Sequence, residues 1–385
     1  MKKPILLLML TTSTAIQAVE LDFKPEVHSF VSFGYFGTTK NEWLGSSTSG
    51  SSEFWEAAAN ASITPLPTVR FAGQLFARDF QRADNGRAQL DWLYGEWRPA
   101  DSIGLQAGRV KIPFGLYNEV RDVDAARATI FLPNSIYAQR SRDLYNSTDG
   151  AKAFGYLHLG PAGSVEYAAF VGRTHFSAAG GFASYLSDVG FGKISEVGLD
   201  YAWGGMLHWH TPVEGLAGRF TVTTLRGLYA YGTSGGMNLS ASSEFSSNLV
   251  PSLSFERGPF TLATEALFAL GSNEINFTDA SGSVIAPPLV RDERGCGGYL
   301  SGSWHFPGDV DSTVSVERLW NDARNLEDVN TTRFSFAVRW GITEHWSVKA
   351  EYQRIIGPGA ALAADNPDGV EDHWDLFALK TTVDF

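Results

Sequence analysis

Apolar and polar residues alternate along most of this chain, and this alternation restricts its fold more than any other feature. In residues 333–342, for example, Phe334, Phe336, Val338, Trp340 and Ile342 alternate with polar or small residues. A period of two residues is typical of β-strands whose two faces meet different surroundings. After the N-terminus, no stretch approaches the ~18–20 consecutive apolar residues that a membrane helix needs. The sequence therefore predicts an all-β protein and excludes a helical membrane protein.

The connections between the expected strands differ in length in a regular way. Seven are short and most contain proline; they lie near residues 64–67, 98–101, 160–163, 211–215, 257–259, 307–309 and 342–345. Eight are long and polar, near residues 38–53, 80–87, 112–150, 173–195, 227–247, 271–296, 321–331 and 355–373. A water-soluble sandwich has no reason to sort its connections by length, whereas outer-membrane barrels do so. The pattern predicts one domain, residues 19–385, that forms a transmembrane antiparallel β-barrel of about sixteen strands with short periplasmic turns and long extracellular loops.

Composition agrees with a barrel in a membrane. Charged residues make up only 19 % of the chain, below the roughly 25 % expected of soluble domains. A closed barrel pairs every backbone N–H and C=O inside hydrocarbon, so its outward side chains can be apolar while its inward ones stay polar. That arrangement explains a mean hydropathy near zero, at −0.11. The net charge of −12 argues against a nucleic-acid partner.

The first eighteen residues have the three parts of an export signal. Lys2 and Lys3 are basic, residues 5–10 are apolar, and small residues end the segment at Ala18. We therefore expect residues 1–18 to be a signal peptide that is removed on export. The single cysteine, Cys296, has no partner in the chain, so no intrachain disulfide is expected in the oxidising compartment.

The last expected strand carries apolar residues on one face and ends on an aromatic residue. Phe377, Leu379, Val383 and Phe385 fall on the same side of a strand. This ending resembles the terminal signature that outer-membrane assembly machinery reads. Phe385 is therefore expected to be the assembly signal, with the barrel-assembly machinery as a partner.

The connection at residues 112–150 is the longest, and two motifs flank it. GRVKIPFGLYNE (residues 108–119) opens it and DGAKAFGY (residues 149–156) follows it. These motifs resemble Gram-negative outer-membrane porins, especially the phosphate-selective porin O/P-like superfamily. The resemblance implies a homotrimer of sixteen-stranded pores whose third loop folds inward to narrow the channel. It also implies an outer-membrane location, with lipid and lipopolysaccharide around the barrel.

The residues of the long connection favour the same placement. Ile130, Phe131, Leu132 and Ile136 are apolar, and an exposed loop would avoid them. We therefore expect an inward-folded constriction loop at residues 112–150. The alternative is an external loop that contacts a neighbouring subunit or lipopolysaccharide.

Charged residues on this loop and on the expected inward strand faces are the candidate residues of the pore. The predicted constriction and lumen residues are Arg70, Arg78, Arg109, Lys111, Glu119, Arg121, Asp122, Asp124, Arg127, Arg140, Arg142, Lys152, Arg333 and Arg339. Arg219 and Lys349 are also expected to face inward, as are the acidic residues Glu56, Asp91, Glu166, Glu256, Glu265, Glu317 and Glu351. Basic and acidic residues on the strands balance, which predicts a weak ion preference. The clustered lysines that phosphate selectivity would imply are absent from the loop.

Two groups of residues raise the question of a metal. His208 and His210 flank Trp209 on an expected strand and share a face, as metal ligands could. No third ligand is evident from the sequence, so polar residues at the pore mouth are the preferred interpretation. Asp365, Asp368, Glu371 and Asp372 could hold calcium, but a solvated loop is preferred. The sequence predicts no metal site and no cofactor.

The sequence thus predicts an outer-membrane porin for passive diffusion of small hydrophilic solutes and ions. An anion- or phosphate-selective porin is the first alternative. A barrel enzyme with a serine nucleophile and a histidine base is another, but no nucleophile motif is present and sixteen strands leave an aqueous lumen. An adhesin or structural barrel would need a plugged lumen, and no plug-like domain precedes the barrel.

Overall fold

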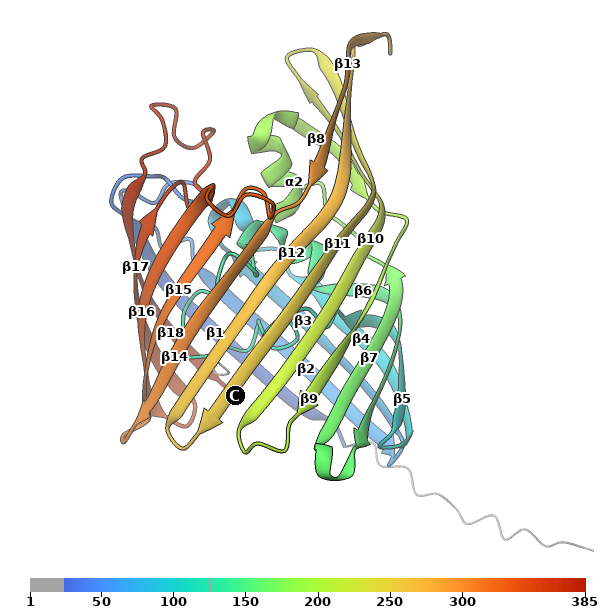
Figure 1. Ribbon diagram of the computed structural model, residues 1–385, viewed down its shortest axis with the longest axis vertical. Coiled ribbons are helices and arrows are strands. Elements are labelled where there is room, and N and C mark those ends of the chain that lie inside the picture. Colours follow the sequence, from blue (N-terminus) through green and yellow to red (C-terminus); the bar gives the residue numbers. More distant parts are fainter. Residues whose placement is uncertain (1–23, 125–126) are drawn as a thin grey trace, which may run out of the picture.

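The computed structural model describes residues 24–124 and 127–385, which form one closed β-barrel (Figure 1). The expected signal peptide, residues 1–18, lies outside the described residues. The sheet contains eighteen strand segments. Two pairs of segments are single barrel strands with a short interruption, because β8 and β9 both pair with β10, and β13 and β14 both pair with β12. The barrel therefore has sixteen antiparallel strands, which confirms the predicted fold class.

The strand segments follow the chain order around the barrel. They are β1 (Glu26–Thr38), β2 (Trp55–Leu66), β3 (Val69–Asp79), β4 (Gln89–Ala100), β5 (Ile103–Lys111), β6 (Ser147–His158), β7 (Ser164–Arg173), β8 (Lys193–Gly198), β9 (Tyr201–His210), β10 (Leu216–Ser234), β11 (Met237–Arg257), β12 (Phe260–Thr278), β13 (Val284–Glu293), β14 (Cys296–Phe306), β15 (Val310–Trp320), β16 (Val329–Thr343), β17 (Trp346–Ile356) and β18 (His373–Asp384).

The first and last strands close the barrel. β1 pairs with β18 from Phe30↔Asp384 to Thr38↔Leu376. Beyond this ladder, Ser29 N donates to Phe385 O at 3.1 Å and Phe385 N donates to Ser29 O at 2.8 Å. This pairing closes the barrel wall without an open sheet edge. Only the segments β8 and β13, above the wall, are paired on one side alone, with β10 and β12. The start of β1 and the end of β18 lie at the same end of the barrel as the short turns (Figure 1).

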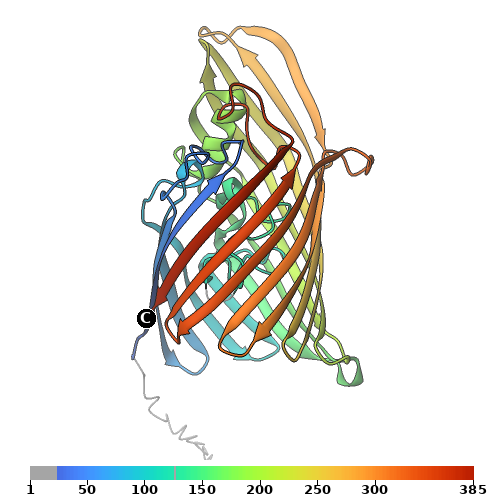
Figure 2. The ribbon, with the colours of Figure 1, turned by 90° about the vertical axis from the view of Figure 1, so that its left-hand side faces the viewer.

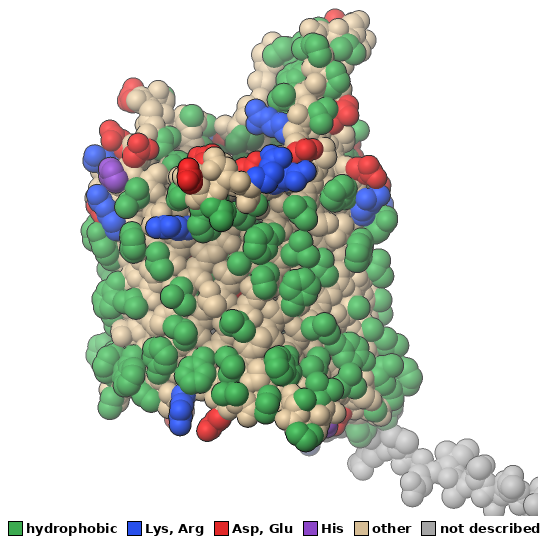
Figure 3. Space-filling view, in the orientation of Figure 1, with side chains coloured by type: hydrophobic (Ala, Val, Ile, Leu, Met, Phe, Trp, Pro, Cys, Tyr) green, Lys and Arg blue, Asp and Glu red, His purple; other side chains and the backbone are tan. Residues whose placement is uncertain are grey.

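The wall separates an apolar outer face from a polar inner face by simple alternation. On β18, Phe377 and Leu379 are 53 % and 56 % exposed on the outside, whereas Ala378 and Lys380 are 3 % and 2 % exposed on the inside. Hydrophobic side chains cover much of the face in Figure 3, and charged side chains gather mainly at the upper rim. Several outward aromatics lie next to the short turns, namely Trp97, Trp209, Phe220, Phe306 and Trp346. This distribution matches the apolar band of a barrel that crosses a bilayer.

Two predicted long loops are instead strand extensions. Residues 227–247 and 271–296 were expected to be polar loops, but β10, β11, β12 and β13 continue through most of them and rise above the other strands (Figure 2). The β10–β11 hairpin ends in Gly235-Gly236, with φ of +59° and +80°, as a two-residue turn requires. The prediction was wrong because strand pairing above the membrane needs no outward apolar residues, so the alternation disappears while the ladder continues.

Short helices lie only in the connections of the described chain. They are η1 (Gln81–Ala83), η3 (Gln139–Ser141), α1 (Arg142–Tyr145), η4 (Gly160–Ala162), α2 (Gly181–Leu186) and η5 (Ser187–Phe191). Among the described residues, no helix has the length and apolar character needed to cross a membrane.

Candidate functional site

The connection between β5 and β6, residues 112–146, folds into the barrel, and we call it the inner segment. Most of its apolar residues are buried in two clusters on two sides of the lumen, whereas Val120 and Val123 are exposed. On one side the buried contacts include Phe114, Leu132, Ile136, Tyr137 and Leu144 against Phe170, Leu225, Val250, Ala263 and Tyr299. On the other side, Ile130 and Phe131 join a cluster with Trp43, Phe54, Phe80, Ile355 and Trp374. The rings of Phe131 and Phe54 stack with their centroids 5.6 Å apart.

Three wall glutamates accept hydrogen bonds from the backbone of the inner segment. Glu265 of β12 accepts from Leu116 N at 2.8 Å, and Glu351 of β17 accepts from Ile130 N at 2.6 Å. Glu317 of β15 accepts from the backbone N–H of the segment at residue 135, at 3.2 Å. A connection without a ladder leaves its N–H groups unpaired, and burial makes each unpaired group costly. The inward carboxylates therefore replace the missing strand partner.

Ion pairs attach the same segment to the wall. Asp124 lies within 2.9 Å of Lys349 on β17 and also within 2.9 Å of Lys380 on β18. Glu119 lies 2.7 Å from Arg219 on β10 and 3.3 Å from Lys152 on β6. Each of these carboxylates thus has basic partners on two different strands.

A third group joins the two ends of the segment to β4. Asp91 lies 2.8 Å from both Lys111 and Arg142, and Asp122 lies at the same distance from both. Burial alone would raise the pKa of Asp122, but Arg142 and Lys111 hold that pKa well below its usual value. Two carboxylates and two basic groups thus form a compact, buried group whose formal charges balance.

The other predicted pore residues lie on inward faces or on the inner segment, and most are paired. Arg109 is the exception, because it lies opposite Leu93 in the β4–β5 ladder and on the same face of β5 as Leu105, both of which are exposed on the outside. Arg78 contacts Asp84 at 3.0 Å, Arg333 contacts Glu317 at 2.9 Å, and Arg109 contacts Asp149 at 2.6 Å. Arg339 bonds Asp309 and Asp311, Arg140 bonds Asp188 and Asp365, and Arg127 lies 3.5 Å from Asp124. Arg70 occupies an inward position of β3 and is half-buried. Most of these charges thus attach elements to one another and carry little unbalanced charge into the lumen.

Arg121 differs from the others. Its side chain is buried and donates to the Asn118 side-chain oxygen at 3.3 Å. No carboxylate lies within ion-pair distance of it in the described part of the chain. Burial, together with the nearby guanidinium groups of Arg142, Arg78 and Arg127, lowers the pKa of Arg121 to about 9. The nearby carboxylate of Asp122 offsets part of this lowering.

The inner segment separates two cavities. The upper one, of about 670 Å³, is lined by residues 134–141 of the segment and by Arg121, Tyr145 and Glu293. The lower one, of about 300 Å³, is lined by residues 127–133 and by Glu256, Arg333 and Arg339. Hydroxyl groups dominate the opposite wall of the lower cavity, from Ser301, Ser303, Thr313, Ser315 and Ser335.

Some residues that hold this site are absent from the sequence-based prediction. Lys380 and Thr382 of β18 both bind Asp124, and Tyr137 donates to Glu265 at 2.6 Å. Alternation on β18 places Lys380 and Thr382 on the inward face and Phe377 and Leu379 on the outward face. The same pattern in the sequence could therefore have identified Lys380 and Thr382 as lumen residues. The four acidic residues considered for calcium do not form a metal-binding group among the described residues, since Asp365 is paired with Arg82 and Arg140 and Glu371 with Lys40.

Comparisons with solved structures agree with this architecture. An OmpF of Salmonella typhi in complex with daunomycin has a TM-score of 0.60 at 9 % identity, over 94 % of this chain and 98 % of that one. An anion-selective porin from Comamonas acidovorans has a TM-score of 0.54 at 11 % identity, over 94 % of this chain and 99 % of that one. OmpT, an outer membrane protein of Vibrio cholerae in a trimer form, has a TM-score of 0.56 at 12 % identity, over 94 % of this chain and 99 % of that one.

At these identities the likeness shows the fold. The predicted porin-type barrel is therefore confirmed at that level. No family model and no curated protein sequence matches the chain.

Proposed function

We propose that this chain, whose fold is that of outer-membrane porins, is a porin of the Gram-negative outer membrane through which small hydrophilic solutes and ions diffuse passively. The observation that carries the proposal is the inner segment, which is bound to the wall on two sides of a polar lumen with a cavity above and below it. A segment held in this way narrows the lumen at a fixed height and limits the size of the solute. Lipid surrounds the apolar outer face, and lipopolysaccharide contacts its charged upper rim.

The proposed pore has no catalytic step. The buried carboxylates of the site, such as Glu265 and Glu351, accept hydrogen bonds from the inner segment, so their role is attachment. The proposed assembly is a homotrimer, supported by the trimer form of the similar Vibrio cholerae protein. The barrel-assembly machinery is the proposed partner during insertion, with Phe385 as its signal.

The extensive pairing of charges favours a weak ion preference. Glu119, Asp122 and Asp124 are each neutralised by basic neighbours at 3.3 Å or less. Paired charges produce a weaker field in the lumen than single ones do, and salt screens what remains over ~8 Å at physiological ionic strength. We therefore propose a general diffusion pore without a tight phosphate site.

An anion-selective porin is the second candidate, and Arg121 favours it. A buried guanidinium without an ion pair in the described part of the chain lines the upper cavity, where it would attract anions. The porin from Comamonas acidovorans with the same fold is described as anion-selective. The two candidates differ only in the sign and strength of selectivity.

Reconstitution into planar bilayers tests both candidates. The porin proposal predicts stable single-channel steps, and their absence from correctly folded protein would refute it. Reversal potentials in a KCl gradient then separate the candidates: a small potential supports the general pore, and a large anion potential that falls in Arg121→Gln supports the second. Arg324→Gln is the matched control, because Arg324 pairs with Asp322 in an exposed loop.

A further inference from the structure

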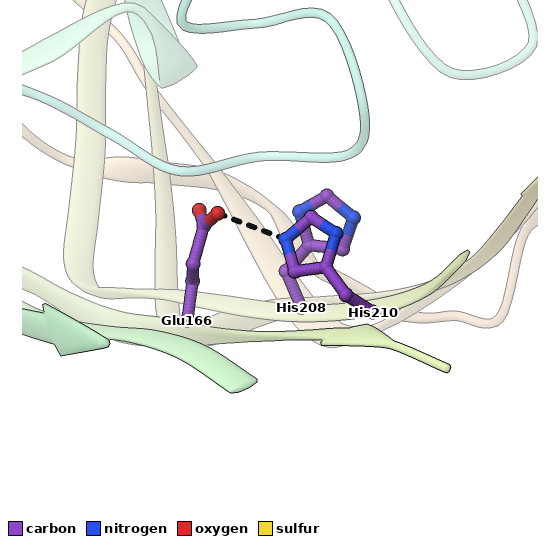
Figure 4. Close-up of side chains that lie close together, drawn as sticks. All are labelled: Glu166, His208 and His210. Carbon is purple, nitrogen blue, oxygen red and sulfur yellow. Dashed lines mark hydrogen bonds and ion pairs between the residues drawn. The ribbon is translucent and has the colours of Figure 1, made fainter. Parts of the chain in front are cut away.

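Two neighbouring strands bring three potential metal ligands together on the lumen wall. In the β7–β9 ladder, Glu166 lies directly opposite His208, and His210 follows two residues later on the same face. The intervening Trp209 and its neighbour Leu207 are 46 % and 57 % exposed on the outside of the barrel. Figure 4 shows the Glu166, His208 and His210 side chains projecting from one side of these strands, with Glu166 and His210 pointing at each other.

The distances match a group that can share one ion. The Glu166 Oε1 and His210 Nε2 atoms are 2.9 Å apart, and the two imidazole centroids are 4.4 Å apart. The ligand atoms of all three residues lie within 4.8 Å of one another. A tetrahedral ion with bonds of about 2.0–2.1 Å needs ligand atoms about 3.3 Å apart, which small side-chain rotations would supply here.

One atom of the group has no partner in the protein. The Nε2 atom of His208 is buried and makes no hydrogen bond with any described residue. Buried ring nitrogens are normally satisfied, because an unpaired one costs free energy. A ligand placed between Glu166 and the two histidines would satisfy it.

We propose that Glu166, His208 and His210 form a binding site for a divalent transition-metal ion of the Zn²⁺ class inside the barrel. Two imidazoles and one carboxylate suit ions of intermediate softness such as Zn²⁺, Ni²⁺ or Cu²⁺. Three protein ligands leave a coordination position open toward the lumen, where water or a small anion would bind.

The electrostatic surroundings permit a cation at this place. Arg219 lies opposite His208 across the β9–β10 ladder, and its charge would oppose an ion. However, its guanidinium is bound to Glu119 at 2.7 Å. Lys152 is bound to the same carboxylate at 3.3 Å. Arg219 and Lys152 therefore pair with Glu119, which leaves Glu166 without an ion pair to either of them.

A second group of potential ligands provides a contrast. His305, Asp309 and Asp311 also lie close together near the β14–β15 turn. There Arg339 approaches both carboxylates, at 3.1 Å and 3.0 Å. The arginine occupies the place that an ion would need, so this group serves as a control rather than as a site.

A bound ion has an electrical consequence that rests on the proposed function. Two positive charges on the lumen wall would repel cations that cross the pore. Zn²⁺ should therefore shift the reversal potential toward anion selectivity. Binding itself depends only on the three side chains and can be measured without any channel activity.

The test uses the full mature chain folded in detergent, without a histidine tag, titrated with Zn²⁺ by isothermal calorimetry. We expect one ion per chain, with an affinity lowered at least about tenfold in His210→Ala and Glu166→Gln and unchanged in His305→Ala. Circular dichroism and the heat-dependent mobility of the folded barrel identify any variant that fails to fold. Glu166→Gln keeps the size and shape of the side chain, so it remains informative where an alanine variant misfolds.

Three results would overturn the site: no Zn²⁺ binding by the wild-type chain, equal binding by the Glu166 and His210 variants, or loss of binding only in His305→Ala. Zn²⁺ binding by a chain that forms no channels would leave the site intact and refute the proposed function instead. A chain that forms conducting channels but binds no Zn²⁺ would support the proposed function and refute the metal site.

Discussion

The ammonium group of Lys349 binds Asp124 twice, at 2.9 Å to the carboxylate and at 2.6 Å to the backbone carbonyl. Lys349 belongs to β17 and Asp124 to the inner segment, and both side chains are almost fully buried, at 0 % and 1 % exposed. One lysine therefore fixes both the charge and the backbone of the segment at a defined place on the wall.

Replacing this lysine should loosen the inner segment. In Lys349→Met, Asp124 keeps Lys380 and Thr382, so we expect the free energy of unfolding to fall by less than the ~3–5 kcal/mol typical of a broken buried pair. We also expect higher and noisier single-channel conductance. Lys193→Met, at an exposed position of β8, is the control. Conductance identical to wild type would show that Lys349 does not hold the segment in the pore.

Gly115 should be intolerant of any side chain. Its φ is +57°, and a Cβ would lie 2.3 Å from the Tyr137 hydroxyl and 2.6 Å from Glu265 Oε2. Gly235 has a φ of +59° with open space around it, so Gly235→Ala reports the backbone strain alone, about 1–2 kcal/mol. We expect Gly115→Ala to lower the urea midpoint more than Gly235→Ala and to change conductance as well. Equal effects of the two substitutions would mean that contacts at Gly115 do not matter.

Asp143 should make stability depend on pH. This residue of α1 accepts from Phe182 N at 3.3 Å, and its other oxygen is buried without a hydrogen bond among the described residues. Burial, with a contribution from Asp84, raises the pKa of Asp143 to about 6 from 3.8. Between these values the folded state binds more protons than the unfolded state, so stability falls as pH rises from about 4 to about 6.

The expected loss of stability is about 1–3 kcal/mol. A tenfold difference in proton affinity between the folded and unfolded states corresponds to ~1.4 kcal/mol, and partial access of water to the Asp143 side chain reduces the effect. Asp143→Asn should remove this contribution and leave a smaller pH dependence, to which Asp365, whose pKa burial also raises, contributes. Urea unfolding of both proteins at several pH values measures it. An equal slope in the two proteins would assign the effect to another group.

Phe385 should matter for assembly more than for stability. Its side chain is 70 % exposed on the outer face, whereas Asp384 bonds His345 at 3.3 Å. A charged residue near the membrane interface costs only ~0–1 kcal/mol, so the folded barrel should tolerate Phe385→Asp. We expect this variant to reach the outer membrane in much lower yield than Asp384→Asn. Similar yields of the two would argue against Phe385 as the assembly signal.

For most strand residues, the amino-acid sequence alone is enough to predict the side of the wall. Alternation is a local property of a β-strand, so the order of residues alone places Phe377 and Leu379 outside, and Glu265, Lys349 and Glu351 inside. The number of connections along the chain also predicted the number of strands. Their lengths were less informative, because the β10–β11 hairpin is a paired strand extension where a long loop was expected.

Which inward residues meet depends on the three-dimensional structure. The pairing of Asp124 with Lys349 and Lys380 joins positions more than 200 residues apart, and its geometry depends on the closure of the barrel and on how the inner segment crosses it. Glu166 became a neighbour of His208 and His210 only through the register of β7 on β9. Alternation repeats every two residues along one strand and carries no information about the neighbouring strand, so partners across the wall and across the lumen are set by register, closure and packing.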